Sequence, residues 1–381
     1  MASIRRRRIT IADVGILLVA TTGIIVLAEI IVRALYADET VLFPRYHTDV
    51  RYGTYTLRRI RPNSDFRHRS VDGSWRFVTN SAGFRNYMDF SYEKPANVIR
   101  VLVLGDSHTQ GYEVRQESTY AAVLARYIER NSDGLSAEVI NAGVSGFSTA
   151  EELLFLENEG TKYHPDVVVL GFYRNDLEDN TKTRLFVLDD QGELQVFKHE
   201  HVPGVKIQNV IYSVPGIQWL SEHSYFYSLL FNTTWQYYKA RLKQQTTKEF
   251  AELAVGMENK FSDYTIDLGA KLIERMYASC QSIGAKLIVV DVPAFGESRP
   301  LESSVPPELK PAVLKASDAY IDSVPLFSEF AGAAELHVPH GHRHISEFTH
   351  AIIGVSLGQE MRSLGVTVPG ALDPLGVVEK R

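Results

Sequence analysis

Three residues with catalytic potential follow three successive apolar segments of this chain. Ser107 comes shortly after the apolar run 98–104, and Gly143 and Asn175 follow the next two runs. A serine hydroxyl can attack an ester carbonyl if nearby donors stabilise the oxyanion that forms. A glycine N–H can approach a ligand closely, and an asparagine amide is a neutral donor. The combination predicts a site for acyl chemistry.

The expected position of Ser107 suits this chemistry. In open α/β sheets, ligands bind outside the carboxyl ends of the strands. A serine at such an end also begins the next helix, where unpaired backbone N–H groups favour negative charge. Gly-Asp-Ser alone is common in turns, so the three successive strand ends together make the prediction.

These motifs resemble those of the SGNH/GDSL hydrolases. Gly105-Asp-Ser-His-Thr109 resembles their block I, Gly143 the block II glycine, and Gly171-x-x-x-Asn175-Asp176 block III. The order and spacing match over about residues 98–180. The phrase Asn80-Ser-Ala-Gly-Phe-Arg85 resembles the bacterial branch with N-terminal membrane anchors.

The resemblance implies a flavodoxin-like, three-layer α/β/α fold. It also implies an oxyanion hole made of the Ser107 N–H, the Gly143 N–H and the Asn175 side chain. Members of the family hydrolyse or transfer esters, including acyl groups on sugars. We therefore expect an acyl-ester substrate, which includes esters on polysaccharides, and no cofactor.

The general base is harder to assign. The family places an aspartate two or three residues before a histidine near the C-terminus. Alignment of segment 340–350 makes His344 the base, with Gly341 and His342 at the acid positions. Three interpretations stay open: another acid or a carbonyl orients His344, His342 or His340 is the base, or the site is degenerate. Loss of the acid in a serine protease costs about 10⁴ in turnover, so a slow enzyme is one expectation.

The histidines of this segment also suggest metal binding. His340, His342 and His344 alternate and would share one face of an extended segment. Imidazoles can bind zinc or another borderline metal. No carboxylate or cysteine partner is near in the sequence, so we expect no metal.

Four residues beside the motifs are interpreted as structural. Asp106 is expected to brace its turn, and Asp176 to cap a helix. Arg174 is expected at the surface or behind the site, with contact to an anionic substrate as its alternative. His108 is expected to point away from the nucleophile, with a substrate contact as its alternative.

Apolar strands alternate with amphipathic helices from residue 98 onward, which predicts a parallel, doubly wound α/β sheet. The predicted strands are 98–104, a strand beginning at 138–140, 167–170 and 286–290. The predicted helices are 120–128, 148–159 and 263–283, with a loop feeding a last helix in 337–364.

The organisation around this alternation is less regular. Arginine and aromatic residues mark 38–97, where we expect short strands packing on the larger domain. The hydrolase domain is predicted at 98–365, with a hairpin of 185–188 and 194–197 opening an insertion at about 183–260. Residues 366–381 form a tail.

The N-terminus predicts a membrane anchor over 11–35, after a basic segment 1–10 that contains four arginines. Its apolar part, Ile11 to Val32, is roughly 33 Å long as a helix, enough for a hydrocarbon core of about 30 Å. Arginines before the span place the N-terminus in the cytoplasm and the catalytic domain outside it. Glu29 and Arg33 have the favourable order for a helical ion pair.

Two alternatives to the anchor stay open. A signal peptide cut after Ala37 would have Leu35 at the third residue before the cut, where a small residue is usual. A buried helix of a soluble protein would explain the charges of Asp13 and Glu29.

Composition sets outer limits on function. The 381 residues can bury a large core, and the 23% charged fraction is ordinary for a folded protein. A net charge of −6 argues against nucleic acid as a partner. Cys280 is the single cysteine, so an intrachain disulfide is impossible, and its helical surroundings predict an inert core thiol.

The sequence therefore predicts a membrane-anchored serine hydrolase acting on carbohydrate or lipid acyl esters. An O-acyltransferase acting on envelope polysaccharide is the alternative enzyme. A catalytically inactive glycan-binding or assembly module is the alternative from another class. Nothing in the sequence indicates the oligomeric state.

Overall fold

A five-stranded parallel sheet forms the centre of the protein in a computed structural model, which describes residues 10–132, 134–254, 261–295, 301–330, 332–340 and 344–366. The strands lie in the order β14-β11-β7-β5-β6. The bounds are β5 (Val98–Gly105), β6 (Ser136–Asn141), β7 (Val167–Phe172), β11 (Lys286–Asp291) and β14 (Ala319–Ile321). Numbered within the sheet, this is the flavodoxin-like order with its switch point between β5 and β7. The predicted fold class is confirmed.

Helices cover both faces of the sheet, because each strand buries side chains in alternating directions. Val101 and Val103 of β5 pack with helices α3 (Tyr120–Asn131) and α12 (Glu347–Ser363). Leu102 and Leu104 face the opposite layer. The helices of that layer are α4 (Thr149–Asn158), α5 (Asp176–Thr183), α9 (Phe261–Ser282) and α10 (Lys310–Lys315).

Several predicted boundaries agree with the structure. Helix α4 begins with the expected capping box, in which the Ser148 N–H donates to Glu151 at 2.9 Å. The predicted hairpin is present as β8 (Phe186–Leu188) and β9 (Leu194–Val196). Strand β14 was not predicted, because three residues are too few to show a strand pattern.

Two antiparallel hairpins precede the sheet. They are β1 (His47–Tyr52) with β2 (Tyr55–Ile60), and β3 (Asp65–Ser70) with β4 (Gly73–Val78). Strand β2 also pairs in parallel with β10 (Glu200–His201), so this region is joined to the segment that follows the β8–β9 hairpin.

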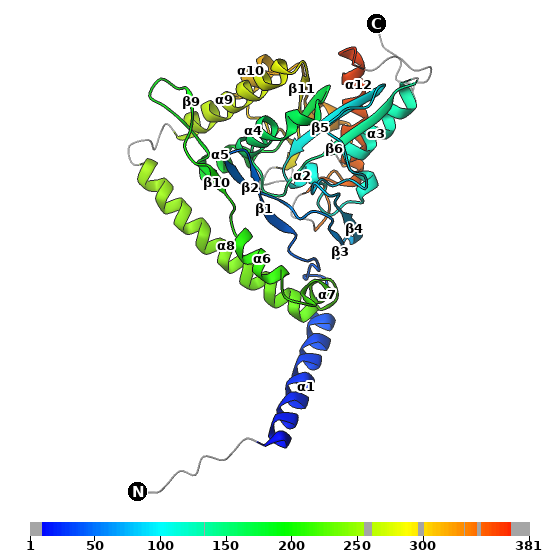
Figure 1. Cartoon of the computed structure of the whole chain (residues 1–381), viewed down its shortest axis with the longest axis vertical. Coiled ribbons are helices and arrows are strands. Elements are labelled where there is room, and N and C mark those ends of the chain that lie inside the picture. The colour runs from blue at the N-terminus through cyan, green and yellow to red at the C-terminus, as the bar shows by residue number, and fades with distance from the viewer. Residues whose placement is uncertain are drawn as a thin grey trace.

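The segment after β10 forms helices between the α/β domain and the N-terminal helix (Figure 1). These are α6 (Val205–Tyr212), α7 (Ile217–His223) and the long α8 (Tyr225–Ala254). The remaining short elements are α2 (Ser107–Gln110), η1 (Gln116–Ser118), η2 (Gly160–Tyr163), β12 (Ala294–Phe295), β13 (Leu301–Glu302) and α11 (Ser323–Ser328).

Helix α1 (Ile11–Leu35) extends away from the rest of the molecule (Figure 1). It is long and apolar enough to be a membrane span or a signal sequence, and Val32 is its buried residue. The Glu29–Arg33 ion pair forms at 3.0 Å. The Glu29 carboxylate also accepts hydrogen bonds from Ser224 and from the N–H groups of Tyr225 and Phe226, so it caps the start of α8.

The basic segment before residue 10 and the tail after 366 lie outside the described residues.

Candidate active site

Ser107 is the first residue of α2, at the carboxyl end of β5. Asp106 caps this short helix, because its carboxylate accepts from the His108 N–H at 2.8 Å. The Thr109 side chain packs so closely on the backbone of Gly105 that only glycine fits there. A Cβ at Gly105, whose φ is +150°, would lie 1.9 Å from the Thr109 hydroxyl. Asp106 therefore braces the turn, as expected, and is not placed as a base.

His344 and Ser107 lie in hydrogen-bond contact although 237 residues separate them. The distance from His344 Nε2 to Ser107 Oγ is 2.8 Å. A β-bridge between His337 and Ile345 fixes the backbone beside His344. Ser346 then caps α12, accepting from the Thr349 N–H at 3.3 Å. This is the geometry that a serine nucleophile and its base require.

Two rings pack against the imidazole of His344. The Tyr112 ring lies 4.6 Å from it and the His108 ring 4.8 Å, measured between centroids. His108 is buried, and its ring packs against that of Tyr173 with centroids 3.9 Å apart. Burial lowers the pKa of His108 well below its usual value, with the other histidines as a smaller cause. A neutral His108 therefore supports His344 rather than pointing away, and sequence reasoning missed both this role and Tyr112.

The neighbouring histidines have other partners. His340 Nδ1 lies 2.8 Å from the Asp72 carboxylate, and the side chain is exposed. His350 is buried in α12, where its Nδ1 accepts from the Tyr120 N–H at 3.1 Å. His342 and Gly341 lie outside the described residues. Within the described part of the chain, no three His, Cys, Asp or Glu residues come together to hold a metal ion.

Gly143 lies where two backbone segments approach each other closely. A Cβ there would be 2.4 Å from the Gln110 nitrogen and 2.8 Å from the Thr109 carbonyl carbon. Its N–H donates to the Asn141 side chain at 3.2 Å, and Asn141 in turn donates to the Thr109 carbonyl at 3.1 Å. The glycine thus has a packing reason of its own, independent of catalysis.

Asn175 precedes α5 and lies beside Asp106. One N–H of its amide donates to the Asp179 carboxylate at 3.0 Å. The amide also forms a hydrogen bond with Asp106. Asn175 therefore lies next to the turn that carries Ser107.

Buried carboxylates lie close to the turn that carries Ser107. Burial, with the charge of Asp179 as a smaller cause, raises the pKa of Asp106 to about 7. Burial and neighbouring carboxylates raise the pKa of Glu152 and Asp176 well above their usual values. The raised pKa values favour the protonated carboxyl groups, which limits the negative charge near Ser107. Asp176 is the first residue of α5 and not the predicted cap, and its carboxylate accepts from the Tyr173 N–H at 3.1 Å.

Arg85 supports the loop beside Ser107. It is the last residue of the motif Asn80-Ser-Ala-Gly-Phe-Arg85, so this support gives the motif a structural role. Its guanidinium is buried and donates to the carbonyls of Gln110 and Val114 at 2.7 Å, and to that of Gly111. These carbonyls lie at the last residue of α2 and in the loop after it, so Arg85 fixes the loop that carries Tyr112. Sequence reasoning noted the phrase and did not assign this role.

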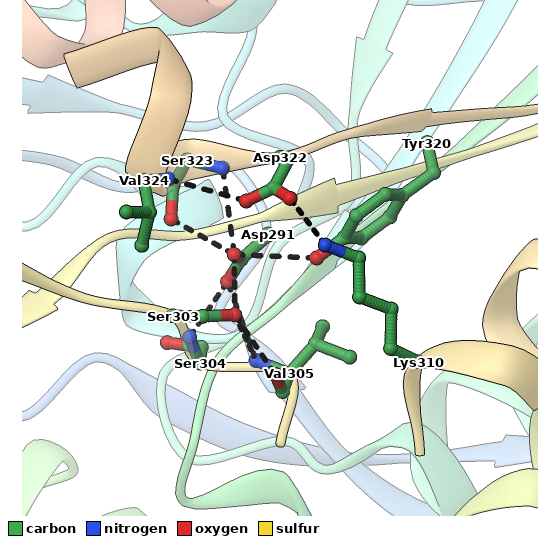
Figure 2. Close-up of polar contacts among 9 residues, drawn as sticks. All are labelled: Asp291, Ser303, Ser304, Val305, Lys310, Tyr320, Asp322, Ser323 and Val324. Atoms are coloured by element: carbon green, nitrogen blue, oxygen red, sulfur yellow. Dashed lines mark hydrogen bonds and ion pairs between the residues drawn. The ribbon is translucent and has the colours of Figure 1, made fainter. Parts of the chain in front are cut away.

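Asp291 has a comparable role at the end of β11 (Figure 2). Its carboxylate is 1% exposed and accepts from the hydroxyls of Ser303 at 2.7 Å and Ser323 at 2.9 Å, and from the Ser304 N–H at 2.7 Å. Burial raises the pKa of Asp291, which the hydrogen bonds oppose. Asp291 thus joins the end of β11 to the segments of Ser303 and Ser323. The carbonyl of nearby Pro293 lies 3.0 Å from His337 Nε2.

Arg174 lies at the surface, 3.4 Å from the Glu302 carboxylate, in agreement with its predicted position.

A cavity of about 670 Å³ is lined by Ser107 and His344 among other residues. Tyr112, which packs on His344, also lines it. Its other walls come from the segment before β1, from the residues around Gly204 and from α8. The N-terminal hairpin region and the insertion therefore build the space in which a substrate would meet Ser107.

Comparison with known proteins agrees with this architecture. The model of the GDSL-like lipase/acylhydrolase family matches residues 103–303. The chain belongs to this family. Hydrolysis of esters is its general reaction, and the SGNH resemblance seen in the motifs is confirmed. No curated protein matches the sequence.

Solved structures similar to this chain include three esterases. A lipase/acylhydrolase from Enterococcus faecalis is 16% identical, covers 72% of this chain and 100% of its own, and has a TM-score of 0.37. A catalytic mutant of an acetylxylan esterase from Geobacillus stearothermophilus is 12% identical, with coverages of 70% and 94% and a TM-score of 0.39. A psychrotrophic esterase from Pseudoalteromonas sp. is 10% identical, with coverages of 70% and 99% and a TM-score of 0.37.

Proposed function

We propose that this protein is a serine esterase in which Ser107 is the nucleophile and His344 the general base. The observation that carries the proposal is the 2.8 Å contact between Ser107 Oγ and His344 Nε2 inside a cavity. His344 takes the hydroxyl proton while Ser107 Oγ bonds to the ester carbonyl carbon. The bond to the alcohol then breaks, and His344 returns the proton to the leaving alcohol. Water releases the acyl group from Ser107 by the same steps.

The oxyanion is assigned to the N–H groups of Ser107 and Gly143 and to the Asn175 amide. The Gly143 N–H bond to Asn141 is long, at 3.2 Å, so an oxyanion can compete for it. Asn175 donates to Asp179 at 3.0 Å and also bonds to Asp106, so the oxyanion would take one of these amide N–H groups in exchange. Such bonds often tighten only when substrate is bound.

The test uses the full chain in neutral detergent micelles, a fluorophosphonate probe and p-nitrophenyl acetate. Ser107→Ala and His344→Ala are each expected to abolish labelling and to lower kcat by about 10³-fold or more. His340→Ala is the matched control, because His340 is exposed and bonded to Asp72, and it should stay near wild type. Loss in His340→Ala with full activity in His344→Ala would overturn the assignment of the base.

We also propose that α1 is a retained membrane anchor, with the catalytic domain outside the cytoplasm. Glu29 lies about 27 Å along α1 from Ile11, near the edge of a hydrocarbon core of about 30 Å. At that level it caps α8, a contact that cleavage after Ala37 would remove. Trp219 on adjacent α7 is 62% exposed, as is typical of aromatic residues at a membrane interface.

Mass spectrometry of the protein from its membrane fraction tests the anchor. An intact chain with α1, resistant to carbonate extraction, is expected. A mature chain beginning at Asp38 in the soluble fraction would establish the signal peptide instead. Protease protection in spheroplasts then reports the side on which the catalytic domain lies.

A further inference from the structure

Arg45 lines the same cavity as the catalytic pair. The residue lies just before β1 and is half-buried. Its Nε atom is buried and has no hydrogen-bond partner among the described residues. A guanidinium in such a position places a cation, with donors to spare, inside the space where the ester is expected to bind.

The guanidinium is held firmly in place. One nitrogen donates to the Asn232 side chain at 2.6 Å, and Asn232 donates in turn to a backbone carbonyl at 3.0 Å. The rings of Phe43, Phe231 and Trp235 lie 4.9, 5.0 and 5.3 Å from its central carbon. Aromatic faces stabilise the cation without neutralising it. The group is therefore organised before any ligand arrives.

Arg45 has no carboxylate partner among the described residues. Within the part of the chain that the structure describes, no Asp or Glu oxygen lies within 4.0 Å of its guanidinium, whereas buried Arg100 is paired with Glu138. Glu39 also lines the cavity, but it is exposed. Burial lowers the pKa of Arg45, and the nearby groups that act on that pKa are tyrosines. A desolvated cation of this kind is best satisfied by an anion.

Arg45 and the catalytic pair share an aromatic wall. Phe43 packs edge-on against Tyr112, with ring centroids 6.2 Å apart, and Tyr112 packs on His344. Arg58 adds a second guanidinium to the cavity and donates to the Gly146 carbonyl. A substrate that places its ester at Ser107 therefore meets positive charge elsewhere in the same space.

We propose that Arg45 binds an anionic group, a phosphate or a carboxylate, on the ester substrate. This deepens the proposed function, because it names the class of substrate, and it rests on that function. The anion can belong to a lipid headgroup or to a water-soluble ester. Planar, two-point recognition of oxyanions is the strength of arginine over lysine.

Calorimetric titration of the full chain in neutral detergent with inorganic phosphate tests the site directly. Wild type and Ser107→Ala are expected to bind phosphate saturably and equally. Arg45→Met keeps the aliphatic contacts with the rings and should bind at least ten-fold more weakly, the effect of losing a charge-assisted hydrogen bond. Arg130→Met, on the exposed end of α3, is the matched control and should bind like wild type. Equal binding by Arg45→Met and wild type would refute the proposal.

A kinetic comparison tests the link to catalysis. The 4-nitrophenyl monoester of terephthalic acid, whose acyl group carries a carboxylate that cannot reach its own ester, is compared with its methyl ester. Wild type should prefer the carboxylate form in kcat/KM by about ten-fold or more, and Arg45→Met should lose that preference. No preference in wild type would count against the site.

The source of the anion is decided in nanodiscs. Inhibition of p-nitrophenyl acetate hydrolysis by phosphatidylglycerol discs, and not by glycerol phosphate with phosphatidylcholine discs, would indicate a lipid headgroup. The reverse would indicate a soluble ester, and inhibition by neither would overturn the proposal.

A second measurement avoids the variant if Arg45→Met does not fold. Phenylglyoxal modifies arginines, and phosphate should protect Arg45 but not Arg130 in peptide maps of wild type. Unchanged modification of Arg45 would refute the site. Phosphate binding in a protein without esterase activity would leave this site standing and overturn only the proposed reaction.

Discussion

Replacement of Arg85 by methionine is expected to destabilise the site without touching Ser107. The guanidinium binds the carbonyls of Gln110, Gly111 and Val114 in a buried setting. Each of these buried carbonyls left without a donor costs about 1–3 kcal/mol. The variant no longer buries a charged group, and this gain offsets part of the combined cost. We expect a net loss of about 3 kcal/mol in the free energy of unfolding, roughly a hundred-fold in the folded-to-unfolded ratio.

Urea denaturation of the full chain in detergent, followed by tryptophan fluorescence, measures this change. Arg115→Met is the control, because that arginine is exposed and paired with Glu347 and should cost less than about 1 kcal/mol. Arg85→Met should also lower kcat under conditions where it stays folded, since the loop carries Tyr112, which packs on His344. Equal stability of the two variants would refute the account of Arg85 as the support of this loop.

Three further predictions concern buried groups. Burial raises the pKa of Glu151 to about 7, so between about pH 4.5 and 7 the folded chain keeps a proton that the unfolded chain releases. As the pH rises through that window, the free energy of unfolding of the wild type should fall relative to that of Glu151→Gln, a substitution that preserves the capping box. Parallel pH profiles of unfolding for the two proteins would contradict this. Gly143→Ala should lower the free energy of unfolding by about 1–3 kcal/mol, because its Cβ would lie 2.4 Å from the Gln110 nitrogen. A variant as stable as wild type would show that helix α2 can shift to make room. Burial raises the pKa of Cys280 to about 12, so iodoacetamide should modify it only after unfolding, as followed by mass spectrometry; rapid labelling of the folded chain would oppose the core assignment.

The parts of the fold that the sequence predicted are those with local signals. Continuous apolar runs and helical periodicity marked β5, α3 and β7, and turn residues marked the hairpin at β8 and β9. Strand β14 escaped notice because three residues carry no periodicity, and its pairing with β11 is a tertiary event.

The same distinction holds in the active site. Ser107 and His344 were predicted from motif order, and the structure brings them together across 237 residues. Tyr112 and Arg45 carry no motif, since their positions depend on how distant segments fold against one another. Arg85 had a motif whose mechanical role is visible only from the carbonyls that it contacts.

The cap that Glu29 provides for α8 has a practical consequence for anyone preparing a soluble fragment. A chain beginning at residue 38 lacks Glu29, whose carboxylate accepts hydrogen bonds from the N–H groups of Tyr225 and Phe226. The first turn of α8 would then lose these partners, and fraying there would spread toward Asn232 and Trp235, which line the cavity. Truncation for convenience would thus alter the wall of the catalytic space, and ester preferences measured on such a fragment would differ from those of the anchored protein.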